Sequence, residues 1–237
     1  MFLVEAGLFE SRARAAEAIA AGLVTADGII VPKASTRIAR DATVAASAPH
    51  PWVSRGGLKL EAALEAFAID PSGLRCLDVG ASTGGFTDVL LSRGAAHVLA
   101  VDVGRDQFHP SLRGHPRVTL REATDIRALG TADVAGAIDL VVCDASFVSL
   151  RIVLPPALAL ARPSGSLVAL IKPQFEAGRG ASKKGLVRDP DVHRAVCRDI
   201  AEFVDRAGWA VSGVVPSPIA GRDGNREFLL GARRRAA

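Results

Sequence analysis

The chain has 237 residues, of which 49% are hydrophobic and 23% are charged. A chain of this length and composition can bury a core without disulfide bonds, so extensive disorder is excluded. Its three cysteines form no Cys-x-x-Cys pair and its five histidines show no ligand spacing, so we expect neither a disulfide scaffold nor a metal site. The net charge of +4 permits an anionic partner without requiring one.

The first fifty residues predict a small α+β module. Ser11 is a suitable N-cap for a helix over residues 12–21, and Gly22 would end that helix. The run LVTADGIIV predicts two short strands joined at Asp27-Gly28.

A break in the pattern follows this module. Prolines occupy positions 49 and 51, and the residue before a proline avoids the helical conformation. We predict an N-terminal domain over residues 1–50, a linker over 51–54 and a second domain over 55–237.

The second domain alternates apolar strands with amphipathic helices. This alternation predicts an α/β domain in which helices cover both faces of a mostly parallel sheet. The predicted strands are 74–79, 97–101, 117–120, 138–143, 166–171, 210–215 and 227–230, and the predicted helices are 58–67, 85–92, 150–161 and 191–207.

Membrane insertion and export are not expected. The apolar stretch 152–171 has the length of a membrane span, but Pro155 and Arg162 interrupt it, which predicts a helix, a turn and a strand. Glu5 and Glu10 stand where a signal peptide would be positively charged or apolar. We therefore expect a cytoplasmic protein without a membrane partner.

A glycine-rich turn joins the strand 74–79 to the helix 85–92. Glycines let a ligand lie against the backbone and the helix N-terminus offers unpaired N–H groups, which indicates a nucleotide-type cofactor. The pattern Asp-x-Gly-x-x-x-Gly-Gly differs from the Gly-x-Gly-x-x-Gly of dinucleotide folds and points away from NAD. The candidate cofactor residues here are Asp78, Gly80, Ala81, Ser82, Thr83, Gly84, Gly85 and Phe86.

Acidic residues recur at the ends of three successive strands. Asp102 ends the second strand, where doubly wound folds hold ribose hydroxyls, and Asp125 follows the third, where an adenine amino group can be met. Together with Asp78 they favour S-adenosylmethionine. Taken singly, each is as well explained by an ordinary strand end.

The residues after the strand 138–143 should face the transferred methyl group. They read Asp144-Ala145-Ser146-Phe147, and the chain contains no tyrosine and no Pro-Cys pair. Methylation of an amine usually uses an Asn/Asp-Pro-Pro-Tyr-like turn, and methylation of a pyrimidine carbon usually uses a cysteine after proline. Two possibilities are left: the methyl acceptor is an oxygen, or the site is passive.

Four side chains are candidates for handling the proton of a hydroxyl acceptor. Lys172 ends an apolar strand at the edge where parallel sheets place ligands, and its position favours a function. Lys59, Asp144 and Glu227 have ordinary explanations as a solvated helix residue, a helix cap and a strand-end charge.

Five segments resemble, in order, the TlyA family of ribosomal RNA 2′-O-methyltransferases, also called hemolysin A. The resemblance implies a Rossmann-like class I methyltransferase domain of the FtsJ type, with seven strands, S-adenosylmethionine as cofactor, and a catalytic Lys-Asp-Lys-Glu quartet at Lys59, Asp144, Lys172 and Glu227. Lys172 would be the base. The segments are residues 53–60, 78–86, 144–147, 171–175 and 224–228.

The resemblance also implies an S4-like RNA-binding domain at the N-terminus. The family usually has a few more residues at its start, and either a late start codon or a shortened domain would explain the difference. Charge supports this weakly, because the residues up to Leu58 include six basic and five acidic side chains. A basic loop, 177–188, could close over RNA beside Lys172. The candidate RNA-binding residues are Arg12, Arg14, Arg37, Arg40, Arg55, Arg179, Lys183, Lys184 and Arg188.

The combined hypothesis is an enzyme that methylates a ribose 2′-hydroxyl of ribosomal RNA, acting on free RNA or on ribosomal subunits. Two alternatives stay open: a cytolysin, as the second family name suggests, and an RNA-binding assembly factor without essential catalysis. The sequence indicates neither the nucleotide nor the oligomeric state.

Overall fold

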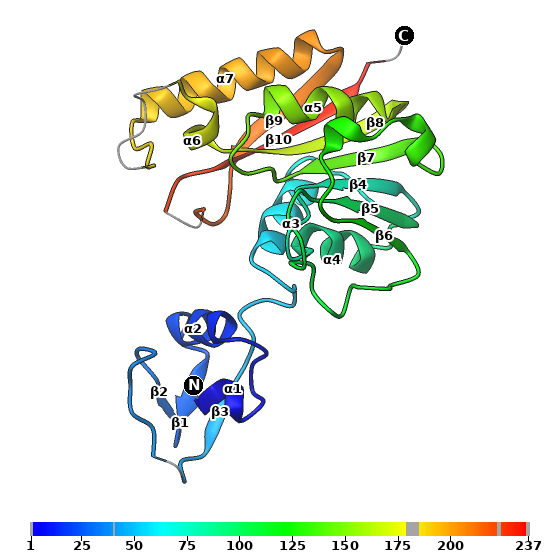
Figure 1. Cartoon of the computed structure of the whole chain (residues 1–237). Helices are drawn as coiled ribbons and strands as arrows, with labels where there is room; N and C mark the ends of the chain where they lie inside the picture. Colours follow the sequence, from blue (N-terminus) through cyan, green and yellow to red (C-terminus); the bar gives the residue numbers. More distant parts are fainter. Residues whose placement is uncertain (1, 40, 179–184, 222–223, 236–237) are drawn as a thin grey trace. The chain divides into compact units, whose positions relative to one another are not determined.

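The computed structural model describes residues 2–39, 41–178, 185–221 and 224–235. They form two compact units, Met1–Pro51 and Trp52–Ala237, which are described separately (Figure 1). No helix in these four ranges is both long and apolar enough to cross a membrane.

The first unit packs two helices against a small antiparallel sheet of order β2-β1-β3. The Ser11 side chain accepts a hydrogen bond from the Arg14 N–H at 3.2 Å and caps α2, as predicted. Asp27 and Gly28 both have positive φ, at 50° and 79°, which is typical of a tight hairpin turn. The elements are α1 (Phe2–Glu5), α2 (Arg12–Ala20), β1 (Val24–Ala26), β2 (Ile29–Ile30) and β3 (Val44–Ala46); α1 and β3 were not predicted.

The second unit contains a seven-stranded sheet of order β6-β5-β4-β7-β8-β10-β9. Strand β10 runs antiparallel to β8 and β9, and the other neighbouring strands are parallel. The predicted α/β class and the mostly parallel sheet are confirmed. The strands are β4 (Arg75–Val79), β5 (His97–Val101), β6 (Val118–Arg121), β7 (Ile138–Cys143), β8 (Ala161–Ile171), β9 (Trp209–Pro216) and β10 (Phe228–Arg234).

Helices cover both faces of this sheet. Figure 1 shows α5 and α7 on one face and α3 and α4 on the other. Successive strand residues alternate between the two cores: Leu77 packs with the α5 and α7 side, and Cys76 with the α3 and α4 side. The helices are α3 (Gly56–Ala66), α4 (Gly85–Ser92), α5 (Leu150–Ala159), α6 (Pro173–Glu176) and α7 (Pro190–Arg206), with short 3₁₀ turns over Ile126–Ala128 and Thr131–Asp133.

Two segments differ from the sequence-based expectation. We expected a linker over 51–54, but Trp52 is 8% exposed and packs in the core of the second unit. Strand β8 begins at Ala161 rather than at residue 166. Its pairing with β7 jumps from Ile138–Ala161 to Leu140–Ser166, so the intervening residues bulge out of register, which accommodates Pro163.

The central strand β4 carries a buried carboxyl group, Asp78. Its side chain has no exposed surface. Oδ2 accepts a hydrogen bond of 2.7 Å from the Thr87 hydroxyl on α4, whereas Oδ1 has no partner among the described residues. Burial raises the pKa of Asp78 from 3.8 to about 7; the Thr87 bond opposes this rise, and the neighbouring Asp144 and Asp102 add to it.

This raised pKa makes the fold sensitive to pH. Well below the unfolded pKa of 3.8, the carboxyl is neutral in both the folded and the unfolded chain. As pH rises towards 7, only the unfolded chain ionises freely, so the folded state loses stability. The Asp78→Asn variant should therefore gain about 4 kcal/mol in unfolding free energy relative to the wild type between pH 4 and pH 8. Urea unfolding of both proteins at the two pH values measures this gain, and parallel pH profiles would contradict it.

Candidate active site

A cavity of about 750 Å³ opens at the carboxyl ends of the parallel strands. This edge of a doubly wound sheet is where such folds bind ligands. The cavity is lined by the first turns after β4, β5, β7 and β8 and by residues from the 3₁₀ turn at Ile126, α3 and the segment before β10. These include Lys59, Gly80, Ser82, Asp102, Val103, Gly104, Gln107, Asp125, Arg127, Asp144, Ser146, Phe147, Lys172, Gln174, Phe175 and Glu227.

The glycine-rich turn contributes only part of its predicted residues to this cavity. Gly80 and Ser82 line it, whereas Asp78, Ala81, Thr83, Gly84, Gly85 and Phe86 are not among the lining residues of the described chain. Gly80 has a φ of 82°, and a Cβ there would lie 3.0 Å from the backbone of Asp144 and Ala145. The turn therefore needs glycine at position 80 to bring β4 and β7 together beside the cavity.

Later residues of the turn have packing contacts of their own. Gly84 has a φ of 92°, and a Cβ there would lie 2.6 Å from Leu112 and 2.9 Å from Phe108. Phe86 is 4% exposed and belongs to the core beneath α3 and α4. These contacts give a physical reason for both residues that does not involve a ligand.

Two predicted carboxylates line the cavity and are held differently. Asp102 accepts hydrogen bonds from the backbone N–H of Ser82 at 2.7 Å and of Gly104 at 2.6 Å, so its orientation is fixed at the cavity wall. Asp125 pairs with the Arg127 guanidinium at 2.6 Å. This arginine, which sequence reasoning missed, lowers the pKa of Asp125 through hydrogen bonds and charge.

The four predicted catalytic side chains meet at one end of the cavity as two ion pairs. Lys59 Nζ lies 2.6 Å from Glu227 Oε2, and Lys172 Nζ lies 2.6 Å from Asp144 Oδ1. The two lysines and Glu227 are each less than 9% exposed. Asp144 is half-buried, so three buried charges and one half-buried charge form two balanced pairs, which is the arrangement that makes burial of charge tolerable.

Strand alternation explains why these distant residues converge. Cys143 and Ile171 face the α5 and α7 core, so the next residues, Asp144 and Lys172, face the α3 side. Leu229 on β10 packs in the α3 and α4 core, and Glu227, two residues earlier, faces the same way. Lys59 on α3 completes the group from above that face.

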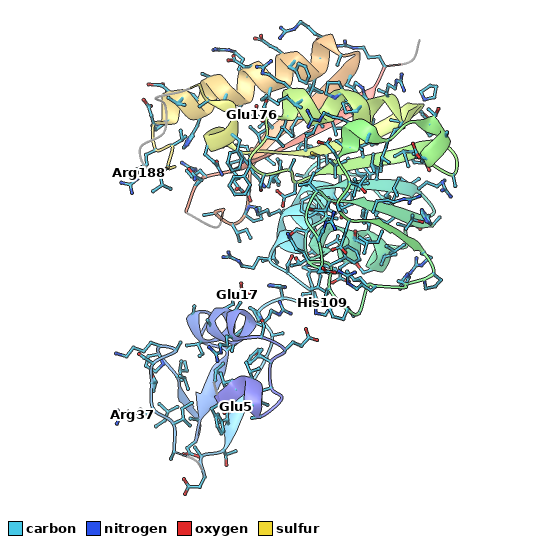
Figure 2. All side chains as sticks on the ribbon, in the orientation of Figure 1. Glu5, Glu17, Arg37, His109, Glu176 and Arg188 are labelled. Carbon is cyan, nitrogen blue, oxygen red and sulfur yellow. The ribbon has the colours of Figure 1, made fainter. Side chains whose placement is uncertain are left out.

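Lys172 has further partners besides the carboxylate of Asp144. Its Nζ donates to the Ser146 hydroxyl at 2.7 Å and to the Asp144 carbonyl at 3.2 Å, in addition to the ion pair. The segment that carries these acceptors is fixed by Glu176 of α6, labelled in Figure 2, which accepts from the Ser149 hydroxyl and the Leu150 N–H at 2.6 and 2.7 Å.

An aromatic pair lies beside the ion pairs. Phe147 is 91% exposed and has a φ of 65°, which is unusual for a bulky residue. Its ring centroid lies 5.2 Å from that of Phe175, and both residues line the cavity together with Gln174. Sequence reasoning named the segment after β7 but did not single out these side chains; an aromatic residue three positions after Asp144 was the available signal.

The predicted RNA-binding residues fall into three groups. Arg40, Arg179, Lys183 and Lys184 lie outside the described residues. Arg14 contacts the ring of His50 at 2.8 Å and donates to its carbonyl at 3.1 Å, so it holds together the ends of the first unit. Exposed positions are occupied by Arg12, Arg37, Arg55 and Arg188; Figure 2 labels Arg37 and Arg188 at the surfaces of their own units.

Buried polar contacts join the end of the basic loop to the segment before β10. Asn225 is 2% exposed; it accepts from the Val187 N–H at 3.0 Å and donates to the Gly185 carbonyl at 2.9 Å. His193 on α7 bonds the Val187 carbonyl at 2.9 Å. Arg188 directly follows Val187, which Asn225 holds, and Asn225 lies two residues before Glu227.

Comparisons with known proteins agree with this architecture. Residues 52–234 match the family model described as FtsJ-like methyltransferase. The chain is 47% identical over 234 residues, 98% of its length and 87% of the relative's, to the 16S/23S rRNA (cytidine-2′-O)-methyltransferase TlyA of Mycobacterium tuberculosis. Hemolysin A of Brachyspira hyodysenteriae is 36% identical, with 94% of each chain covered.

A solved structure extends the likeness to the first unit. A Streptococcus thermophilus protein provisionally described as a hemolysin is 38% identical, covers 98% of this chain and 86% of its own, and superimposes with a TM-score of 0.80. The matched family model and these near-full-length relatives lead to one conclusion: the chain belongs to the TlyA family of FtsJ-like methyltransferases.

Proposed function

We propose that this protein transfers the methyl group of S-adenosylmethionine to a ribose 2′-hydroxyl of ribosomal RNA. The observation that carries the proposal is the pair of buried ion pairs, Lys59–Glu227 and Lys172–Asp144, at one end of the cavity. The family supports the chemistry, and the M. tuberculosis relative is named for cytidine 2′-O-methylation of 16S and 23S rRNA.

The other end of the cavity has the groups that this cofactor needs. Asp102, held by two backbone N–H groups, presents oxygen atoms suited to ribose hydroxyls, and Asp125 is an acceptor for an adenine amino group. Gly80 leaves the backbone open where a side chain would press on the turn after β7. When bound, S-adenosylmethionine supplies a methyl group activated by a sulfonium charge.

The residues of the chain must remove one proton and align one oxygen. The 2′-oxygen forms a bond to the methyl carbon while its O–H bond breaks, so a base is needed at the oxygen. We assign this role to Lys172, which acts as the base after its ammonium group has released the proton that it holds in the ion pair with Asp144. Once protonated, its ammonium group is stabilised by Asp144 and Ser146, which favours acceptance of the proton. Glu227 holds Lys59 as the neighbouring cation.

The substrate itself is tested by mapping. Cells that lack the gene should lose ribose methylation at specific positions of ribosomal RNA, and the purified protein should restore it on isolated subunits. A cytidine is the expected nucleotide, because the M. tuberculosis relative is named for it. Unchanged ribose methylation in the deletion strain, together with no transfer in vitro, would remove this function.

The base assignment predicts a specific pattern among Lys172 variants. Lys172→Ala should reduce single-turnover methyl transfer by about 10²- to 10⁴-fold, the usual loss for a general base, while the cofactor affinity stays within a few-fold. Lys172→Arg should not restore activity, because a guanidinium group keeps its proton at any working pH. Transfer to ribosomal subunits and calorimetry with the cofactor, on the same preparations, measure both quantities.

Lys59→Arg is the matched comparison. It keeps a positive charge within reach of Glu227, so it should retain more activity than Lys172→Arg if the two lysines differ in role. Near-normal chemistry in Lys172→Arg would show that position 172 supplies only charge, and the base would then be another group.

Phe147 offers a surface for the nucleobase whose ribose is methylated. An exposed phenyl ring at a strained backbone position, backed by Phe175 and open to the cavity, is suited to stacking on an unpaired base. Ring stacking holds the nucleotide by its flat face and leaves the ribose to be positioned between Lys172 and the methyl group.

Loss of this ring should weaken catalysis on RNA without affecting the cofactor. Phe147→Ala should lower kcat/KM for ribosomal RNA by about ten- to a hundredfold, since stacking of one base contributes about 1–3 kcal/mol. Phe147→Trp should retain most of the activity, and calorimetric affinity for S-adenosylmethionine should be unchanged in both. Equal losses in the alanine and tryptophan variants would argue against stacking.

We also propose that the first unit is an S4-like RNA-binding domain. Its support is the family relationship and the exposed Arg12 and Arg37, while Arg14 is engaged with His50 and is expected to stabilise the unit instead.

A further inference from the structure

The groups that contact Lys172 differ in whether they can donate a hydrogen bond as well as accept one. A carboxylate oxygen and a carbonyl oxygen, both from Asp144, only accept hydrogen bonds. The third partner, the Ser146 hydroxyl, lies 2.7 Å from Nζ and can either accept or donate. Ser146 is exposed and lines the cavity, whereas Lys172 is only 6% exposed.

These properties determine where the proton of Lys172 can enter or leave. A neutral amine has two N–H groups and one lone pair. With one N–H donating to the Asp144 carbonyl, the amine can turn its lone pair towards Ser146. The Ser146 hydroxyl can then reverse its hydrogen bond and donate to Nζ. In that state its own oxygen is an acceptor that faces the cavity.

We propose that Ser146 is a catalytic residue that relays the proton of the ribose hydroxyl to Lys172. The inference rests on the proposed function. As the 2′-oxygen forms its bond to the methyl carbon, its O–H bond breaks and that proton moves to Ser146 Oγ. The original Ser146 proton moves to Lys172 Nζ. The electron pair of the broken S–C bond stays on sulfur. Lys172 gains one proton, and Ser146 ends as a neutral hydroxyl, as it began.

The relay explains how a nearly buried lysine serves an oxygen in an open cavity. Asp144 and the turn held by Glu176 fix the positions of Nζ and Oγ, so neither group needs to move during transfer. The ribose has only to place its hydroxyl within hydrogen-bond distance of Oγ, which is the exposed member of the pair.

Two substitutions at this position test the relay. Ser146→Ala should reduce single-turnover transfer to ribosomal subunits by at least about tenfold, and by no more than the roughly 10²- to 10⁴-fold that proton transfer contributes. Ser146→Thr keeps the hydroxyl and should recover most of the rate. Ser92→Ala, which removes a hydroxyl bonded to the Val89 carbonyl on α4, is the matched control and should behave as wild type. Cofactor affinity and thermal unfolding, measured on each variant, should be unchanged.

A solvent isotope measurement separates a relay from a structural role. Two protons in flight make the rate a curved function of the deuterium fraction of the solvent, and one proton makes it linear. The wild type and Ser146→Thr should give curved plots and Ser146→Ala a linear one. The same full rate in Ser146→Ala and the wild type would show that the ribose hydroxyl simply displaces Ser146, and so would a linear plot for the wild type.

The result also distinguishes this inference from the proposed function. If the wild type transfers methyl groups to ribosomal RNA and Lys172→Ala does not, the function stands whatever Ser146 does. If the wild type shows no transfer, the function and the relay fall together. The ζ-ammonium resonance of Lys172, one of five lysines, reports the contact without RNA: it should change in Ser146→Ala and persist in Ser146→Thr.

Discussion

Balanced burial of four charges is the constraint on which the second unit depends. Lys59 and Glu227 come from a helix and from the segment before the last strand, and their 2.6 Å ion pair joins the two. Lys172 and Asp144 join the ends of β8 and β7 in the same way. Removal of one partner from such a pair leaves an uncompensated charge in a poorly hydrated place. The strand order must therefore bring these ends together, and the antiparallel β10 is what delivers Glu227 to the edge where β7 and β8 terminate.

The same alternation that fills the cores positions the chemistry. Asp144, Lys172 and Glu227 all follow or precede strands whose neighbouring residues pack on a known face, so their side chains point to the α3 side without special backbone geometry. The turns that border the cavity include positive φ values at Gly80, Ser82 and Phe147. Phe147 is the bulkiest of the described residues with a positive φ, so its backbone carries strain beside the cavity.

Apolar runs and breaker residues were sufficient to predict the seven strands and the main helices, because period and burial are local properties of the sequence. The pairing of Lys59 with Glu227 could not be predicted from local patterns, because 168 positions separate the two residues. The family resemblance grouped them. The role of the glycine-rich turn in cofactor binding also stays a prediction, for a different reason. Gly84 and Phe86 satisfy packing against Leu112, Phe108 and α3, and a sequence does not distinguish glycine required by a neighbour from glycine required by a ligand. Strand β3 has three residues and no strong pattern, and it forms only because β1 offers it a partner.

Charge conservation links the two ends of the cavity in the proposed reaction. Before transfer, the positive charge belongs to the sulfonium of the cofactor; afterwards the sulfur is neutral and the positive charge is a proton on Lys172. The reacting groups thus keep the same total charge, and the charge moves only from one part of the cavity to another. Asp144, 2.6 Å from Nζ, stands where the charge arrives. Because the Lys59–Glu227 pair is internally neutral, it adds no net charge to this exchange. The Lys59–Glu227 pair stays neutral and the Lys172–Asp144 pair gains the proton. The site can therefore accept the positive charge that methyl transfer places on Lys172 without drawing a counterion from solvent.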